Sequence, residues 1–295
     1  MTGAQVDRRR RVVIHEDDVG MTHGANVAFA ELSALGTCSC GSVMVPCPWF
    51  PEAAEMAGAN PALDLGVHLT LTSEKRPYRW RPLTAPPRSA GLTDEMGYFW
   101  ADVPSVRCNA VPDAVEAEMR AQIDTALASG FDVTHLDAHM GTVMCPEFVD
   151  IYLRLGIDYR LPLLLVRDYT AFNPRSYSGP MSNDRYEAAL AEAQARGFPV
   201  CEVVHETPWR RTTDAPTAYR AMLRGIAEGL TFLSMHFNAP GDFEAVEPAE
   251  ARIRAEEYAL FRAPLVPAWI EQDGLEVVGL RGLRDDLRAH WAGAA

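Results

Sequence analysis

The sequence predicts a single α/β domain, a distorted TIM-like β/α barrel with about seven βα units. Short apolar runs alternate with helical stretches along nearly all of the 295 residues. This alternation is typical of a parallel sheet covered by helices. The number of units favours a barrel over a small open sheet, and barrels of roughly 250 residues are routinely single domains. We therefore expect residues 1–295 to form one domain.

Local signals support the individual elements. The helix expected at 26–35 is followed by Gly36, which suits a left-handed C-cap. Proline stands at the start of the helices expected at 112–128 and 146–155. The strands are expected at 12–15, 42–45, 65–71, 133–136, 159–166, 200–204, 231–236 and 275–280. The other helices are expected at 51–57, 185–195, 217–228, 249–261 and 283–290.

One long segment, 73–110, interrupts the alternation beside the strand expected at 65–71. It is rich in Pro, Gly, Trp and Arg, and long loops in compact domains are usually functional lids or disordered. We expect it on the substrate side. Its aromatic residues could stack on a ligand or pack the loop down, and both alternatives stay open. These residues are Tyr78, Trp80, Tyr98, Phe99 and Trp100.

The composition argues against nucleic acid and membranes as partners. The net charge of −13 gives no basic footprint for anionic polymers or lipids. No apolar run reaches the roughly 20 residues of a membrane span, and the arginines at 8–11 lack the apolar stretch of a secretory signal. None of the six cysteines forms a C-x-x-C pair. We expect a cytoplasmic protein, with homo-oligomerisation left open.

Polar side chains recur where the expected strands end. Asp17 and Asp18 follow the first strand, and six of the eight histidines lie at such positions. In a β/α barrel these ends meet at one mouth, where active sites form. Any one such histidine is more often structural, but together with the carboxylates they predict a divalent metal site. The six are His15, His68, His135, His139, His205 and His236.

Five motifs resemble the YdjC-like family, which includes chitooligosaccharide and hopanoid-associated deacetylases. They are EDDVGMTHGAN at 16–26, GVHLTLT at 66–72, THLDAH at 134–139, YRLP at 159–162 and the spaced MH and PG pairs within 235–241. Their order and spacing cover nearly the whole chain. The resemblance implies a distorted barrel and metal-dependent removal of acetyl groups from small N-acetylated sugars, a hydrolysis of an amide bond.

The resemblance also implies a role for individual residues. A divalent ion, Zn²⁺ or Mg²⁺, is expected, and Asp137 could accept a hydrogen bond from a ligand imidazole. The general acid stays open among His236, His15 and His205, as does the identity of the sugar. The implied metal ligands are Asp18, His68 and His139, the base is Asp17, the residue that orients the base is Arg160, and the acid is His236.

Two other functions stay in view. A metal-dependent sugar isomerase or epimerase would also place His and Asp at strand ends. The pair Asp17 and Asp18 together with Arg160 argues against it, because an isomerase does not need a base beside a ligand in this way. The second alternative is a carbohydrate-binding protein without catalytic activity, which the full set of candidate catalytic residues disfavours.

Overall fold

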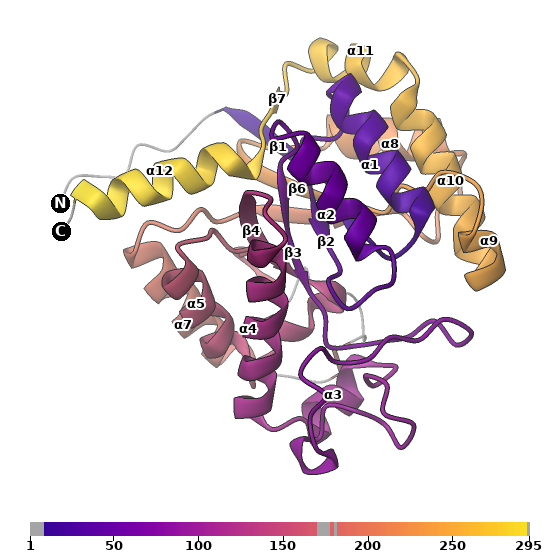
Figure 1. Cartoon of the computed structure of the whole chain (residues 1–295). Helices are drawn as coiled ribbons and strands as arrows, with labels where there is room; N and C mark the ends of the chain where they lie inside the picture. Colours follow the sequence, from indigo (N-terminus) through magenta and orange to yellow (C-terminus); the bar gives the residue numbers. More distant parts are fainter. Residues whose placement is uncertain (1–8, 170–177, 180–181, 294–295) are drawn as a thin grey trace.

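Parallel strands form the centre of the molecule, and helices lie around them (Figure 1). The computed structural model describes residues 9–169, 178–179 and 182–293. The strands pair in the order β4-β3-β2-β1-β6-β5, and β7 pairs with β1, so the predicted α/β class is confirmed. The strands are β1 (Arg10–Val19), β2 (Cys40–Val43), β3 (Leu65–Leu69), β4 (Val133–Ala138), β5 (Val203–Glu206), β6 (Gly229–Met235) and β7 (Glu276–Val277).

Two isolated bridges join the outer strands of this sheet into a ring. Leu136 of β4 pairs in parallel with Leu163, and Val166 pairs in parallel with Cys201, just before β5. The amide of Leu164 donates to the Leu136 carbonyl over 3.0 Å. The segment 161–166 therefore occupies the position of the fifth strand, and the ring of pairings agrees with the predicted distorted barrel.

The inside of the ring is divided between an apolar and a polar half. Val13 of β1 belongs to a separate apolar cluster, whereas Val12 and Ile14 pack in the main core under the helices. His15 lies two residues after Val13 in β1 and so faces the same side. It packs on Phe232 with ring centroids 4.8 Å apart. The polar half thus begins towards the carboxyl ends of the strands. The inner cluster consists of Val13, Cys40, Leu164, Cys201, Leu230, Phe232 and Leu280.

The helices begin and end where the chain supplies suitable caps. Thr22 accepts from the amide of Ala25 at the start of α1, and Gly36 ends this helix with φ of 72°, as predicted. The helices are α1 (His23–Leu35), α2 (Phe50–Ala59), α3 (Val103–Asn109), α4 (Pro112–Ala128), α5 (Val149–Tyr159), α7 (Asp184–Ala195), α8 (Ala215–Arg224), α9 (Phe243–Val246), α10 (Pro248–Arg262), α11 (Leu265–Gln272) and α12 (Leu280–Gly293), with short 3₁₀ turns at Arg88–Ala90 and His139–Met144.

The long segment 73–110 is tied down by its own aromatic residues. Trp80 donates to the Thr72 carbonyl over 2.8 Å, and Trp100 donates to the Gly91 carbonyl over 2.8 Å. Phe99 is fully buried, and the Tyr78 hydroxyl donates to the Met21 carbonyl over 2.6 Å. Of the two alternatives left open by the sequence, these contacts favour packing of the loop over stacking on a ligand.

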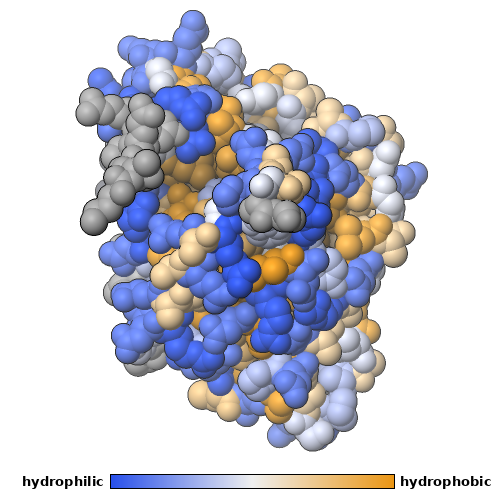
Figure 2. All heavy atoms as spheres, turned by 90° about the vertical axis from the view of Figure 1, so that its left-hand side faces the viewer, coloured by the Kyte–Doolittle hydropathy of each residue, from blue (hydrophilic) through white to orange (hydrophobic). Residues whose placement is uncertain are grey.

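The surface carries mostly polar side chains on the face that contains the left-hand side of Figure 1. Hydrophilic residues dominate the face shown in Figure 2, with hydrophobic residues between them. Within the part of the chain that the structure describes, no helix has both the length and the apolar character needed to cross a bilayer.

Candidate active site

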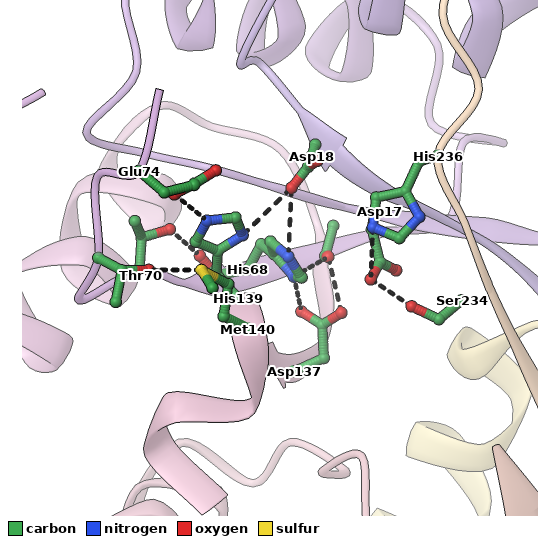
Figure 3. Close-up of polar contacts among 12 residues, drawn as sticks. Asp17, Asp18, His68, Thr70, Glu74, Asp137, His139, Met140, Ser234 and His236 are labelled. Carbon is green, nitrogen blue, oxygen red and sulfur yellow. Dashed lines mark hydrogen bonds and ion pairs between the residues drawn. The ribbon is translucent and has the colours of Figure 1, made fainter. Parts of the chain in front are cut away.

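Three side chains of the types that bind metals converge at the carboxyl ends of strands of one sheet (Figure 3). Asp18 lies at the end of β1, His68 in β3, and His139 directly after β4. The Asp18 Oδ1 lies 3.6 Å from His68 Nε2 and 3.2 Å from His139 Nδ1. The structure thus brings together the three residues that the resemblance pointed to, in a buried group whose ligand atoms lie within 4.8 Å of one another.

An irregular end of β1 lets two adjacent carboxylates face the same pocket. Neighbouring residues of a regular strand point to opposite sides. Here the register of β1 against β2 shifts between Glu16 and Val19, and Asp18 has a positive φ of 63°. Aspartate tolerates this left-handed conformation better than most residues, and such conformations cluster at functional sites. Asp17 and Asp18 therefore both line the pocket.

The chemistry of this group fits a divalent cation. The Asp18 Oδ1 is buried and has no hydrogen-bond partner, although it lies between two imidazole nitrogens. A buried carboxylate oxygen that makes no hydrogen bond is costly, and here only the two nearby imidazoles offset the loss of water. Two imidazoles and one carboxylate are a ligand set found in metalloenzymes, with positions left for water and substrate.

Each candidate imidazole ligand is held from behind by a carboxylate. His68 Nδ1 donates to Asp137 Oδ1 over 2.9 Å, which is the contact expected for Asp137, and Ser42 donates to the other oxygen of Asp137 over 2.9 Å. His139 Nε2 lies 3.2 Å from Glu74 Oε2. Burial disfavours a charged His139, but Glu74 and Asp18 outweigh it and raise its pKa to about 10. The pocket therefore favours positive charge at this point.

Arg254 of α10 pairs with the third candidate ligand, Asp18. Its Nη1 donates to Asp18 Oδ2 over 2.8 Å, and both side chains are buried. Burial acts to raise the pKa of Asp18, but Arg254 and His139 more than offset it, so the pKa lies well below its usual value. Asp18 is therefore ionised and carries one oxygen towards Arg254 and one towards the imidazoles.

Asp17 is held by a histidine and a serine. His15 Nδ1 lies 2.6 Å from Asp17 Oδ1, and Ser234 donates its hydroxyl to Asp17 Oδ2. Burial opposes ionisation, but the hydrogen bond and charge of His15 lower the pKa of Asp17 below its usual value. His236 Nε2 faces Asp17 Oδ2 at 3.9 Å (Figure 3). The ionised carboxylate of Asp17 thus faces the His236 imidazole, which can accept or donate a proton.

Arg160 does not orient Asp17, contrary to the sequence-based expectation. It is exposed at the C-terminus of α5 with φ of 55°, and its carbonyl accepts from Arg288. It lines a separate cleft with Arg196 and His290. Arg160 was expected within a strand at 159–166, but α5 continues to Tyr159, and Arg160 lies between this helix and the segment 161–166. It therefore lies at the opposite end of the barrel from the carboxyl ends.

Of the three histidines left open as general acid, His236 is the one that lines the pocket. It follows β6 and packs against Trp209 with ring centroids 4.8 Å apart. Burial and the charge of Arg254 lower its pKa to about 4. His15 is fully buried beneath Asp17 instead, and His205 lies within β5 without lining the pocket.

The pocket around these residues has a volume of about 450 Å³. Among its residues that were not expected from the sequence, three carry polar or aromatic groups next to the candidate ligands or His236: Glu74, Trp209 and Arg254. Glu74 is near His68 in sequence and carries a ligand-type side chain, so the strand-end argument could have found it. Trp209 and Arg254 come from a loop and a helix face that carry no such signal. The lining also includes Lys75, Met140, Glu206, Arg210, Ser234, Glu250 and Ile253.

Comparisons with known proteins place the chain in a family. The model of the YdjC-like protein family matches residues 11–272. Over 153 residues, or 52% of each chain, it is 45% identical to a carbohydrate deacetylase of Thermus thermophilus. Over 181 residues it is 28% identical to a chitooligosaccharide deacetylase of Yersinia enterocolitica, covering 61% of this chain and 68% of that one. The chain spans about half the length of several of the curated relatives it matches.

A solved structure supports the same conclusion at the level of the fold. A crystal structure from Enterococcus faecalis V583, named provisionally as a cellobiose-phosphate cleavage protein, superimposes with a TM-score of 0.76. The two sequences are 22% identical, and the match covers 93% of this chain and 99% of the other. With a family match over most of its length, this chain belongs to the YdjC-like protein family.

Proposed function

We propose that this protein is a metal-dependent hydrolase that removes the acetyl group from an N-acetylated sugar. The observation that carries the proposal is the buried Asp18 Oδ1, which makes no hydrogen bond and lies between His68 and His139, directly beside an ionised Asp17. A metal site with an adjacent carboxylate base is what hydrolysis of an unreactive acetamide requires. The names of the curated relatives, carbohydrate deacetylase and chitooligosaccharide deacetylase, support the same reaction.

In this proposal Asp18, His68 and His139 hold the metal. A bound divalent ion polarises the acetamide carbonyl and lowers the pKa of water towards about 7. Of the two ions that the sequence left open, we favour Zn²⁺, because two of the three ligands are imidazoles and Mg²⁺ prefers oxygen. The carboxylates behind His68 and His139 fix which ring nitrogen faces the ion.

The protein's own groups move the protons. Asp17, kept ionised and oriented by His15 and Ser234, takes a proton from the attacking water. His236 faces Asp17 and delivers a proton to the nitrogen of the departing amine. The C–N bond breaks, and acetate and a free amine leave the pocket.

The pocket suits a small polar substrate. Its volume of about 450 Å³ lies within the range for small-ligand sites. Its rim carries charged side chains of both signs, among them Glu206, Arg210 and Glu250. We propose an N-acetylated hexosamine, free or within a short saccharide, as substrate. We place the activity in the cytoplasm, where the free thiols of the six cysteines would persist.

The test is acetate release from a panel of N-acetylated saccharides after chelation and reloading with single divalent metals. We expect metal-dependent release, with Asp17→Asn lowering kcat about 10²–10⁴-fold while the metal content is kept. Asp18→Asn should instead lower the metal content. If ketose forms in place of acetate, the isomerase alternative is correct. No turnover of any sugar by the fully metal-loaded protein would overturn the proposal.

A further inference from the structure

His236 is connected to a buried carboxylate through a single threonine. His236 Nδ1 lies 3.0 Å from Thr207 Oγ1, and Thr207 Oγ1 lies 2.9 Å from Glu257 Oε1. Thr207 directly follows β5, and Glu257 lies on α10 with its side chain fully buried. The chain of contacts therefore runs from the reaction pocket, through the barrel wall, into the layer between strands and helices.

Glu257 collects three donors. Besides the Thr207 hydroxyl, the Tyr219 hydroxyl donates to Oε1, and the backbone amide of His236 donates to Oε2 over 2.7 Å. Burial raises the pKa of Glu257 to about 7 even though these three hydrogen bonds favour the charged form, so the carboxylate is ionised above that pH. A carboxylate with this set of donors accepts from each of them.

The hydrogen positions in this chain follow from the donor and acceptor inventory. An ionised Glu257 can only accept, so the Thr207 hydroxyl proton points to Glu257. The oxygen of Thr207 must then accept from His236, which places a proton on Nδ1. In a neutral imidazole the other nitrogen, Nε2, carries a lone pair, and Nε2 is the atom that faces Asp17.

We propose that Thr207 and Glu257 act as positioning residues that hold His236 in the Nδ1-protonated tautomer, so that its Nε2 can accept the proton that Asp17 collects. This inference rests on the proposed function for its catalytic consequence, but the tautomer itself is a property of the folded protein. The contacts of Thr207 and Glu257 do not extend to the substrate pocket, whose lining includes His236 and not these two residues.

The proton balance is simple. Asp17 takes one proton from the attacking water and passes it across the gap to Nε2 of His236. The resulting imidazolium is stabilised because its Nδ1 proton is already directed, through Thr207, at the Glu257 carboxylate. Nε2 then gives the proton to the amine nitrogen as the C–N bond breaks, and both groups return to their starting states. The opposite tautomer would have a proton on Nε2 and could not accept.

The first test reads the tautomer without any substrate. Ring ¹⁵N NMR of the Zn²⁺-loaded protein, with the His236 signals assigned by their loss in His236→Gln, should show the Nδ1-protonated form. Thr207→Val removes the acceptor and should give a mixture, or the Nε2-protonated form. Thr207→Ser keeps a hydroxyl and should restore the wild-type pattern. In Glu257→Gln the amide can donate to Thr207, which then turns its own proton towards His236, so the tautomer should switch.

The second test measures the consequence for turnover. Thr207→Val should lower kcat about 10²-fold or more with KM within about twofold, because a wrong tautomer affects proton transfer and not binding. Thr207→Ser should recover most of kcat. Thr231→Val is the matched control, since Thr231 is also a buried threonine, lies in β6, and does not line the pocket.

The two tests separate the inference from the proposed function. If no sugar is deacetylated, the function fails, while the NMR experiment still decides the tautomer. An Nε2-protonated His236 in the wild type would overturn the inference. It would also be overturned by a Thr207→Val protein that keeps both the tautomer and kcat.

Discussion

The carboxylate of Asp18 is shared by two positive charges. One is the guanidinium of Arg254, and the other is the proposed metal ion. Arg254 already binds Oδ2, and the proposed metal would take Oδ1. Because the two cations repel each other and draw on the same carboxylate, the arginine weakens Asp18 as a ligand. In the metal-free protein Arg254 stabilises the fold instead, because it pairs the buried carboxylate of Asp18.

This competition predicts the effect of Arg254→Met. The methionine keeps an apolar chain against the rings of Phe243 and Trp209, which Arg254 now covers. We expect metal binding to become tighter by about 5- to 150-fold, the usual range of a coupling between two sites. Competition with a chelating dye measures it. The exposed Arg252→Met on the same helix is the control, and a weaker metal affinity would show that Arg254 chiefly orients Asp18.

At the residue scale, the sequence was informative where the polar side chains belong to the strands themselves. Asp18, His68 and His139 lie at or near the carboxyl ends of β1, β3 and β4, which belong to one parallel sheet, so local patterns could bring them together. The partners that orient them are harder to find. Arg254 lies 236 positions from Asp18 on a helix face, and no spacing rule connects the two. The resemblance gave the orienting role to Arg160, whereas His15 and Ser234 contact Asp17.

At the scale of elements, most strands and helices could be predicted, and the errors have local causes. The strand expected at 159–166 begins later, because α5 continues to Tyr159. The helix ends there with Arg160 in a left-handed conformation, so the glycine that usually marks such an end is absent, and only Pro162 signals it. The strand expected at 275–280 is shorter, at Glu276–Val277, because α12 already begins at Leu280.

The last helix, α12, anchors the barrel at the end opposite to the pocket. Arg284 is buried and donates to the Val133 carbonyl over 2.9 Å and to Asp132 over 2.5 Å, at the start of β4. The family match ends at residue 272, so β7 and α12 lie outside it. These elements therefore contribute to this barrel beyond the part that the family model covers.

We expect Arg284→Ala to lower the free energy of unfolding by about 1.5–3 kcal/mol, because a buried carbonyl loses its charged donor. The ion pair adds little to this, since Asp132 is half exposed. Urea denaturation measures the change. Arg288→Ala should lose less than about 1 kcal/mol, because its bond to the Arg160 carbonyl is exposed. Metal content should stay unchanged in both, and a loss of metal in Arg284→Ala would contradict this separation of the two ends.

For the whole molecule, the alternation of strands and helices predicts the parallel class, but not how the ring closes. Closure depends on the pairs Leu136–Leu163 and Val166–Cys201, and each is a single bridge without an extended ladder. A sequence pattern that is read locally does not contain such long-range pairs. The ring therefore has the fewest backbone pairings between β4 and β5. The candidate ligands lie on β1, β3 and the turn after β4, where the strands are joined by extended ladders.

A metal bound to these three ligands would join the ends of three strands only in the folded protein. It should therefore stabilise the fold by about 2.7 kcal/mol at a free concentration of 100 times Kd. For a chain of this size we expect the Tm to rise by about 5–10 °C, since each kcal/mol corresponds to roughly 2–4 °C. Thermal unfolding with Zn²⁺ and after chelation measures the difference. His68→Ala should abolish the shift and Asp17→Asn should retain it, because only the first removes a proposed ligand. An equal shift in His68→Ala would mean that the ion stabilises the protein from another place, and the ligand assignment would then be wrong.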